Sequence, residues 1–262
     1  MPELPRITIV TPSFNQAAFL ERTICSVLDQ GYPNLEYIIV DGGSTDGSVE
    51  IIRKYADRLA WWVSESDGGQ SEAINKGLRR ATGDWVGWQN SDDVYFPGAF
   101  AQLATAARRW PRSVLITGDM QIIDEQDSLI RDLRYVQPSY KALLAEGMVI
   151  ANQAAFWRRS LHERIGWLDE TLHYAFDYEW FLRALRTSAD VRHVPYFLGG
   201  LRYHDATKTS SSQSEFAREF IKIINGRELP GWKKRLFQLR RLLLTLGYGH
   251  FGYVLRGLLR RM

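Results

Sequence analysis

Two adjacent aspartates, Asp92 and Asp93, follow a largely apolar run at residues 85–89, after Asn90 and Ser91. The run is typical of a buried strand, and neighbouring carboxylates repel each other unless they face a cation, hydrogen-bond donors or water. At the carboxyl end of a strand in an α/β sheet, the pair would lie where such sheets bind ligands. We interpret it as a divalent-metal site for a diphosphate, with a solvated Asp-Asp turn as the simpler alternative.

Acidic residues also end two earlier apolar runs. The run at residues 37–40 stops at Asp41, and another run leads to Asp67. Because the carboxyl ends of parallel strands share one edge of a sheet, these acids would meet the adjacent pair there. Glycines beside both acids let the backbone approach a ligand, and a helix N-terminus that follows favours an anion. An ordinary turn capped by Asp46 or Ser44 is the structural alternative.

Alternating strand and helix patterns position these acids. A β-branched run at residues 7–11 is followed by an amphipathic segment with Asn15 as its expected N-cap, and similar pairs follow. Such repeats predict right-handed βαβ units, and therefore an α/β fold around a parallel sheet. Further along, residues 114–119 predict another strand, and residues 120–134 predict a hairpin that turns near Asp127.

Four motifs, in this order and spacing, resemble those of the family 2 glycosyltransferases. They read Thr11-Pro12-Ser13-Phe14-Asn15, then Val40-Asp41-Gly42-Gly43-Ser44-Thr45-Asp46, then Asp67-Gly68-Gly69 with Asn75-Lys76-Gly77, and finally Asn90-Ser91-Asp92-Asp93. The resemblance implies an inverting enzyme of the GT-A fold that uses a nucleotide-diphosphate sugar. That fold has a Rossmann-like, mostly parallel central sheet flanked by helices. The second motif departs from the pattern, because many relatives have Asp-Asp-Gly-Ser where this chain has Asp-Gly-Gly-Ser.

The resemblance also assigns roles to the matching positions. Asp41 and Asp67 would accept hydrogen bonds from the base. Asp93 would bind Mn²⁺ or Mg²⁺, and Asp92 would lie nearer the ribose. The other positions that would line the nucleotide site are Thr11, Pro12, Ser13, Asn15 and Lys76.

The second half of the chain supplies candidates for acceptor binding and catalysis. Residues 152–158 predict a strand in the part of the family's fold that receives the acceptor, where Gln153 and Trp157 would contact a sugar. A structural role for the polar Gln153 is the alternative. A helix is predicted to begin near Asp177, and the resemblance makes this residue the general base, with Glu179 as second choice. These two acids lie about 200° apart on a helix, so both are not expected to face the same site. Inversion needs a base to take the proton of the acceptor hydroxyl, although the helix macrodipole alone also favours an acid here.

His204 follows a predicted strand and precedes a polar loop that contains Lys208. In relatives a His at this place can complete the coordination of the metal, and nearby basic residues hold the diphosphate. The resemblance therefore assigns His204 to the metal, and Arg202 and Lys208 to the diphosphate, whereas a lone His is more often structural. The loop is a candidate lid that orders when the nucleotide binds.

The last stretch, residues 232–262, contains eight Lys or Arg and no acid, interspersed with apolar and aromatic residues. Two helices broken around residues 247–249 are predicted. A basic, amphipathic, aromatic segment favours binding to an anionic membrane surface. Packing on the domain or on a second subunit of an oligomer is the alternative.

The composition is that of a folded protein. With 262 residues, 45% of them hydrophobic, the chain can bury a substantial core, and its net charge of +3 implies no general affinity for nucleic acid. We expect a GT-A domain at residues 1–225, divided into a nucleotide-binding half at 1–100 and an acceptor-binding half at 101–225, and a basic helical tail at 226–262. A single cysteine and no apolar leader favour a cytoplasmic location, peripheral on the inner face of the cell membrane if the tail binds there.

The predicted function is a metal-dependent, inverting hexosyl transfer from a nucleotide-diphosphate sugar, by default a UDP-sugar, to a hydroxyl of a glycan or lipid-linked acceptor in cell-surface polysaccharide assembly. One alternative is a sugar-1-phosphate nucleotidyltransferase, which normally carries a Gly-rich, Arg/Lys-bearing loop after the first strand; this chain has Pro12-Ser13-Phe14-Asn15 there. The other is a non-catalytic nucleotide-sugar-binding scaffold protein, which would keep the pocket but could lose the base.

Overall fold

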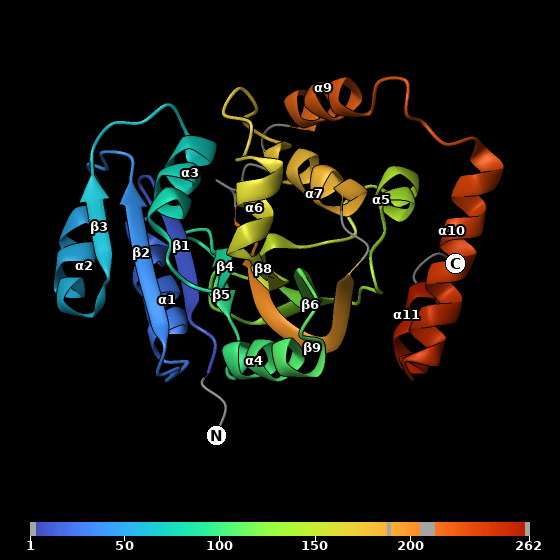
Figure 1. The fold of residues 1–262 in the computed structure, drawn as a ribbon, viewed down its shortest axis with the longest axis horizontal. Coiled ribbons are helices and arrows are strands. Elements are labelled where there is room, and N and C mark those ends of the chain that lie inside the picture. Colours follow the sequence, from blue (N-terminus) through green and yellow to red (C-terminus); the bar gives the residue numbers. More distant parts are fainter. Residues whose placement is uncertain (1–3, 188–189, 205–212, 260–262) are drawn as a thin grey trace.

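One sheet runs through the molecule in the computed structural model, which describes residues 4–187, 190–204 and 213–259 (Figure 1). Nine strands of this described part join it in the order β3-β2-β1-β4-β8-β6-β9-β5, with β7 beside β6. The strands are β1 Ile7–Ser13, β2 Leu35–Asp41, β3 Trp61–Ser64, β4 Trp85–Trp88, β5 Val94–Tyr95, β6 Leu115–Ile123, β7 Leu129–Leu133, β8 Ala155–Arg158 and β9 Val191–Arg202.

The sheet changes character at β4. Strands β3, β2, β1 and β4 are parallel to one another, as the βαβ pattern predicts. Beyond them, β8 is antiparallel to both β4 and β6, whereas β6 and β9 are parallel. Residues 1–100, predicted as the nucleotide-binding half, therefore contribute the four parallel strands together with β5, which is antiparallel to β9, and the later strands form the mixed part.

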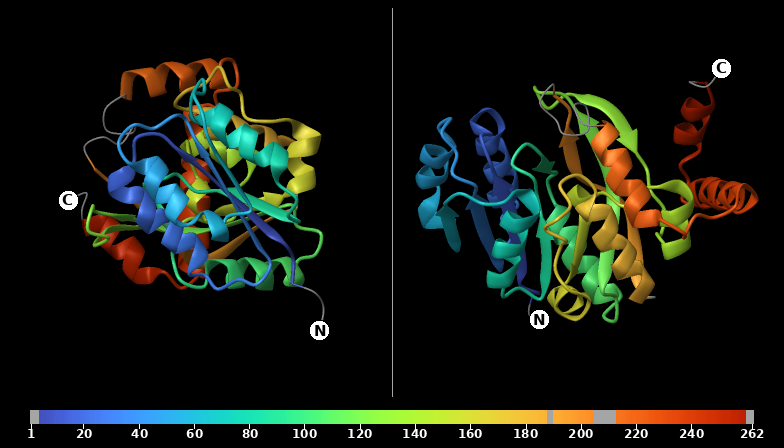
Figure 2. Two further views of the ribbon diagram at one scale, coloured as in Figure 1. Left: turned by 90° about the vertical axis from the view of Figure 1, so that its left-hand side faces the viewer. Right: turned by 90° about the horizontal axis from the view of Figure 1, so that it is seen from above.

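Helices cover both faces of the sheet (Figure 2). They are α1 Ala17–Leu28, α2 Ser48–Lys54, α3 Gln70–Arg80, α4 Ala99–Arg109, α5 Tyr140–Glu146, α6 Arg159–Ile165, α7 Phe176–Thr187, α9 Gln213–Ile224, α10 Gly231–Gly247 and α11 Phe251–Leu259. Side chains of α1, α2 and α4 share one buried cluster with Ile7 and Ile9 of β1. Side chains of α3, α5, α6 and α7 share the other cluster with Val10 of the same strand. Because successive strand residues point to opposite faces and both faces are covered, the strands of the parallel half are apolar runs without polar alternation.

Two local predictions need correction. Asn15 does not cap α1: the N-cap position is Gln16, and the carboxylate of Asp46 accepts from the amide of Ala17 at 2.8 Å. Asp46 also accepts from the amide of Ser48 at 3.0 Å, so it satisfies the starts of both α1 and α2. The strand predicted at 152–158 begins only at Ala155, after one turn of 3₁₀-helix.

Candidate active site

The acids identified in the sequence do follow the ends of neighbouring parallel strands. Asp41 ends β2, which pairs with β1 and β3. The adjacent aspartates follow β4, on the other side of β1. The loops after β1, β2, β3 and β4 therefore lie along one edge of the sheet, the upper edge in the view of Figure 1.

Asp41 organises the loop that follows it. Its side chain is fully buried, and Oδ2 accepts from the amides of Gly43 and Ser44 at 3.1 and 2.9 Å and from the hydroxyl of Ser64 at 2.7 Å. Within the described residues, Oδ1 accepts from the hydroxyl of Ser44 alone, at 2.6 Å. A carboxylate oxygen has two lone pairs, so Oδ1 retains one acceptor site for the predicted bond to a base.

The glycine that departs from the family motif makes room for Asp67. A Cβ on Gly42 would lie 2.9 Å from Oδ2 of Asp67, and Oδ1 accepts from the amide of Gly69 at 2.9 Å. Burial raises the pKa of the Asp67 carboxyl, and the negative charge of Glu72 adds to this effect. In this chain the position of the Asp67 carboxylate thus depends on the absence of a side chain at residue 42.

We expect Gly42→Ala to weaken nucleotide binding by a few-fold to about tenfold, because the added methyl group must displace the Asp67 carboxylate. The melting temperature should change little, since the displaced group is the end of a side chain beside a loop. Titration of the nucleotide into both proteins checks this, and Asp67→Ala is the matched variant: Gly42→Ala should add nothing further in that background. If Gly42→Ala and the wild type bound the nucleotide with equal affinity, the assignment of Asp67 to the nucleotide-binding site would be contradicted.

Asp93 is enclosed by hydrogen-bond donors. Its side chain is buried, Oδ2 accepts from Asn90 Nδ2 at 2.9 Å and from Gln153 Nε2 at 2.8 Å, and Oδ1 accepts from the amide of Arg202 at 2.9 Å. Burial and the neighbouring Asp92 raise the pKa of Asp93 to about 7. This environment fits a side chain that holds the loop together. Gln153 is itself buried and directed at Asp93, which corrects its predicted contact with an acceptor.

Asp92 faces a different partner. Its carboxylate Oδ2 lies 3.2 Å from Nε2 of His204, and this contact raises the pKa of the imidazole. The Asp92 side chain keeps 18% of its surface exposed, whereas that of His204 is almost fully buried and lies against the ring of Phe19, 4.4 Å between centroids. Of the two adjacent aspartates, Asp92 is the one that is partly exposed and contacts a side chain of a type that can bind metals, that of His204.

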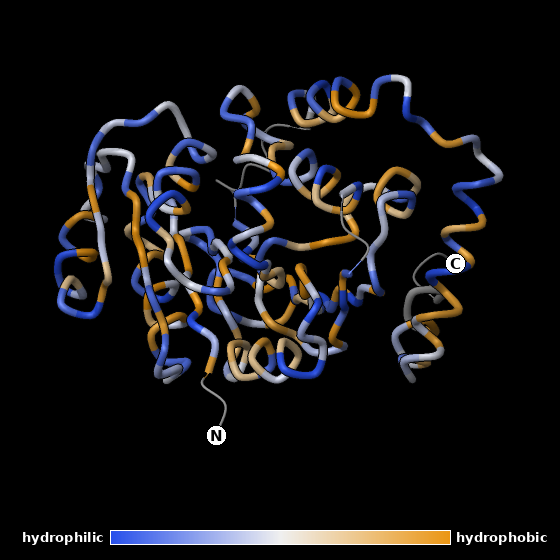
Figure 3. Tube along the Cα trace, viewed as in Figure 1, coloured by the Kyte–Doolittle hydropathy of each residue, from blue (hydrophilic) through white to orange (hydrophobic). Residues whose placement is uncertain are grey.

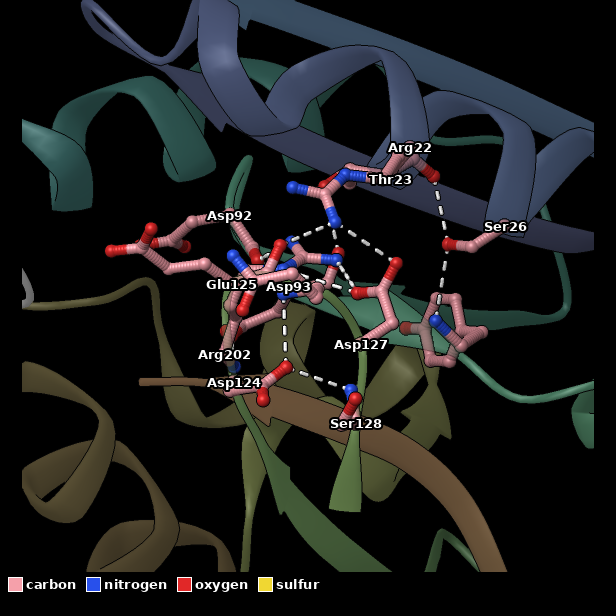
Figure 4. A network of polar contacts seen from close by, with 12 residues as sticks. Arg22, Thr23, Ser26, Asp92, Asp93, Asp124, Glu125, Asp127, Ser128 and Arg202 are labelled. Atoms are coloured by element: carbon pink, nitrogen blue, oxygen red, sulfur yellow. Dashed lines mark hydrogen bonds and ion pairs between the residues drawn. The ribbon is translucent and has the colours of Figure 1, made fainter. Parts of the chain in front are cut away.

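A polar network that joins β9, α1 and the turn between β6 and β7 binds the backbone of the loop that carries Asp92 and Asp93 (Figure 4). The guanidinium of Arg202, at the end of β9, donates to the carbonyl of Asp92 and to the carboxylate of Asp127. Asp127 lies in the turn between β6 and β7 and also pairs with Arg22 of α1 at 3.0 Å. The hydroxyl of Thr23 donates to the carbonyl of Asp93 at 2.7 Å. Arg202 is fully buried and bound within the chain, which corrects its predicted contact with a diphosphate.

The residues present fit a divalent ion that is shared with a substrate. Within the described ranges, no three His, Cys, Asp or Glu side chains converge into a ready-made metal site. Mg²⁺ and similar hard cations are commonly held by one or two carboxylates together with substrate phosphates and water. Asp92 with His204 can supply such a partial site. Asp93 accepts three hydrogen bonds within the chain and keeps one of its four acceptor sites, so its role as a metal ligand stays a prediction.

Asp177 and Glu179 point to different surroundings, as their helical spacing predicts. Asp177 lies in the first turn of α7, accepts from the amide of Tyr178 at 2.7 Å, and has its pKa raised to about 6, mainly by burial. Glu179 binds Arg183 through both oxygens at 2.7 Å, and the guanidinium of Arg183 also donates to two backbone carbonyls. Glu179 is therefore part of an ion pair with Arg183, and Asp177 stays the predicted base.

Glu219 is a residue that the sequence reasoning missed. It projects from α9 and accepts from the amides of residues 173, 174 and 175, at 2.9, 2.9 and 2.8 Å, immediately before the helix that carries Asp177. Its negative charge raises the pKa of Asp177 further, after burial. The amides of residues 173–175 thus donate to a side chain on a helix about forty residues later in the chain.

We expect Glu219→Gln to move the acidic limb of the activity profile to lower pH. Loss of the negative charge favours the ionised form of Asp177, so the pKa of Asp177 falls and the active form survives to lower pH. The control is Glu215→Gln on the same helix, an acid that makes no bond to residues 173–175. A pH profile of kcat/KM that is unchanged by Glu219→Gln, but altered by Glu215→Gln, would contradict this assignment.

The remaining predicted residues are distributed as follows. Thr11 is buried and its hydroxyl lies 3.0 Å from that of Tyr37, Pro12 and Ser13 are buried in β1, and Asn15 Oδ1 accepts from the amide of Thr45 at 3.0 Å. Lys76 pairs with Glu65 at 2.9 Å. Trp157 is fully buried among Trp88 and Trp180, which corrects its predicted contact with an acceptor. Lys208 lies outside the described residues.

Comparison with known proteins places the chain in a family. Residues 8–185 match the family model described as glycosyl transferase family 2. An uncharacterised glycosyltransferase of Mycobacterium tuberculosis is 34% identical over 187 residues, which cover 70% of each chain. A putative teichuronic acid biosynthesis glycosyltransferase of Bacillus subtilis, TuaG, is 41% identical over 94 residues, covering 35% of this chain and 37% of TuaG.

Solved structures of glycosyltransferases share the fold. Residues 1–349 of TarS of S. aureus, crystallised with UDP-GlcNAc, superpose with a TM-score of 0.69 at 17% identity, covering 93% of this chain and 73% of that fragment. The mannosyltransferase PcManGT of Pyrobaculum calidifontis, in complex with GDP-Man and Mn²⁺, gives a TM-score of 0.65 at 21% identity, covering 90% of this chain and 69% of PcManGT. The chain belongs to glycosyltransferase family 2 and has the GT-A fold.

Proposed function

We propose that this glycosyltransferase is inverting and metal-dependent, and that it moves a hexose from a UDP-sugar to a hydroxyl of a glycan or lipid-linked acceptor. The observation that carries the proposal is the pairing of Asp92 with His204 beside the strand ends, while Asp93 is enclosed. Family membership weighs against a nucleotidyltransferase. Family membership does not decide whether the chain is an active enzyme or a non-catalytic nucleotide-sugar-binding scaffold protein, and an assay of transferase activity tests this.

The donor site would use the loops after β1, β2, β3 and β4. Asp41 and Asp67 would recognise the base, and Asp92 with His204 would hold Mn²⁺ or Mg²⁺. When bound, the ion would neutralise charge that develops on the leaving diphosphate. The complex of TarS with UDP-GlcNAc supports a UDP donor, and the complex of PcManGT with GDP-Man and Mn²⁺ supports a divalent ion.

Asp177 would act on the acceptor. Its carboxylate would take the proton of the acceptor hydroxyl as that oxygen attacks the anomeric carbon, which inverts the configuration in one displacement. The loop that leads to α7 packs against the donor half: the ring of His173 would lie 3.5 Å from a Cβ on Gly69, close to Asp67. This contact supports a base that works beside the donor sugar.

The role in cell-surface polysaccharide assembly is supported by the similarity to TuaG. The test of the reaction is direct. UDP-hexoses with an α-linked sugar are incubated with the enzyme, Mn²⁺ and cell-wall glycan fragments, and the product is examined by NMR. We expect UDP release and a β-linked sugar in the product. An α-linked product would contradict inversion, and release of nucleoside monophosphate or of pyrophosphate would contradict glycosyl transfer.

A further inference from the structure

The helix α10 is fixed to the rest of the chain along one side. It packs against α5, and the guanidinium of Arg241 pairs with the carboxylate of Glu146 at 2.8 Å. Phe237 packs against the buried cluster that contains Val10 and side chains of α3, α5, α6 and α7, and Thr245 is buried. These three α10 residues lie within about 80° of one another around the helix, at 100° per residue. This side of α10 therefore faces the catalytic domain.

The opposite side of α10 presents an apolar stripe to solvent. Its members are spaced by four, three and four residues, so they fall within about 60° of helix surface. The stripe consists of Trp232, Leu236, Leu239 and Leu243, with exposed fractions of 62%, 55%, 52% and 59%. Helix α11 continues the pattern with exposed Phe251 and Leu255, one turn apart. Figure 3 shows hydrophobic segments along both helices at the end of the molecule away from α2 and β3.

Positive charge borders this stripe without any negative charge. Lys233 and Arg235 are exposed and lie on either side of the stripe, at about +100° and −60° from Trp232. The chain has no Asp or Glu after Glu228. An apolar strip with cations on both sides, and an aromatic residue at its start, matches a surface that is anionic outside and apolar beneath.

We propose that α10 docks this glycosyltransferase on the surface of an anionic lipid bilayer through the stripe of Trp232, Leu236, Leu239 and Leu243. The stripe would enter the boundary between headgroups and acyl chains, and Lys233 and Arg235 would contact anionic headgroups. The helix would lie in the plane of the surface, since no helix in the described ranges combines the length and the apolarity needed to cross a bilayer. The acceptor half, to which α10 is fixed, would then be the part nearest the membrane.

The proposal is tested by sedimentation of the full chain with vesicles, a measurement that does not depend on transferase activity. Vesicles of phosphatidylcholine alone are compared with vesicles of phosphatidylcholine and phosphatidylglycerol. We expect binding only to the second kind. Leu236→Glu with Leu243→Glu should reduce this binding roughly tenfold or more, and each of Lys233→Gln and Arg235→Gln should reduce it about fivefold. Ile221→Glu is the matched control, an exposed apolar residue on α9, and should bind like the wild type.

Three results would overturn the proposal. One is equal binding to neutral and anionic vesicles, and another is equal binding by the Ile221 and Leu236/Leu243 variants. The third is a stable dimer in size-exclusion chromatography with light scattering that the Leu236/Leu243 variant converts to a monomer, because the stripe would then be a subunit interface. Unchanged circular dichroism and melting temperature confirm that each variant is folded, as expected for solvent-exposed positions.

Discussion

Replacement of Asp177 by Asn is expected to lower kcat by about 10²–10⁴-fold while nucleotide binding stays at the wild-type level. The Asn side chain has nearly the same size and can still accept from the amide of Tyr178, but it cannot take a proton. The matched variant is Glu179→Gln, two residues along the same helix. It should keep most of its kcat and lose thermal stability instead, because the ion pair with Arg183 is structural.

The same assignment predicts a pH dependence. A base must be ionised to accept a proton, and the pKa of Asp177 is raised to about 6. The value of kcat/KM should therefore rise about tenfold per pH unit below this pKa and level off above it. The rise should disappear in Asp177→Asn. An Asp177→Asn enzyme with wild-type activity, or with the same acidic limb, would assign the base to another residue.

The second large effect is expected at the adjacent aspartates, which should respond in opposite ways. Asp92→Asn should lower Mn²⁺ affinity by at least the roughly 10–100-fold typical of losing a supporting residue behind a metal ligand, with little change in melting temperature. Asp93→Asn should lower the melting temperature, because its amide group would face the amide groups of Asn90 and Gln153. His204→Ala should resemble Asp92→Asn.

Electron paramagnetic resonance of Mn²⁺ in the presence of UDP, together with thermal melting, separates these effects. If Asp93→Asn remained stable and lost Mn²⁺ binding, while Asp92→Asn kept it, Asp93 would be the metal ligand, as the family resemblance implies. Metal binding unchanged in both variants would place the ion elsewhere.

The parallel half of the fold was predictable because β1, β2 and β3 are apolar runs that are each followed by a helix, and β4 is a further apolar run. The two buried clusters, one on each face of the sheet, follow from β1 alone, because Ile7 and Ile9 point to one face and Val10 points to the other. The mixed half was not predictable to the same degree. There, β5 has only two residues and β8 only four, and their pairing with β9, β4 and β6 is set by contacts between distant segments.

The motifs indicated which loops form the site but not which side chain faces outward. Asp92 and Asp93 are the same residue type side by side, and their surroundings differ because Gln153 and the amide of Arg202, sixty and more residues away, converge on Asp93. Glu219 carried no local signal at all, since its bonds to residues 173–175 depend on how α9 packs. The short loop around Asp67 was easier to predict from the sequence, because its glycines indicate that the backbone lies close to other groups.

The most direct test of the account is a calorimetric titration of UDP, GDP and dTDP into the wild-type chain, with and without Mn²⁺. We predict that UDP binds, that binding is stronger with Mn²⁺, and that GDP and dTDP bind more weakly. Metal-dependent binding of GDP or dTDP in place of UDP would agree with the proposed binding site but would show that the donor carries a different nucleotide. Failure of all three nucleotides to bind in the presence of Mn²⁺ would contradict a nucleotide-sugar site at the ends of β1, β2, β3 and β4.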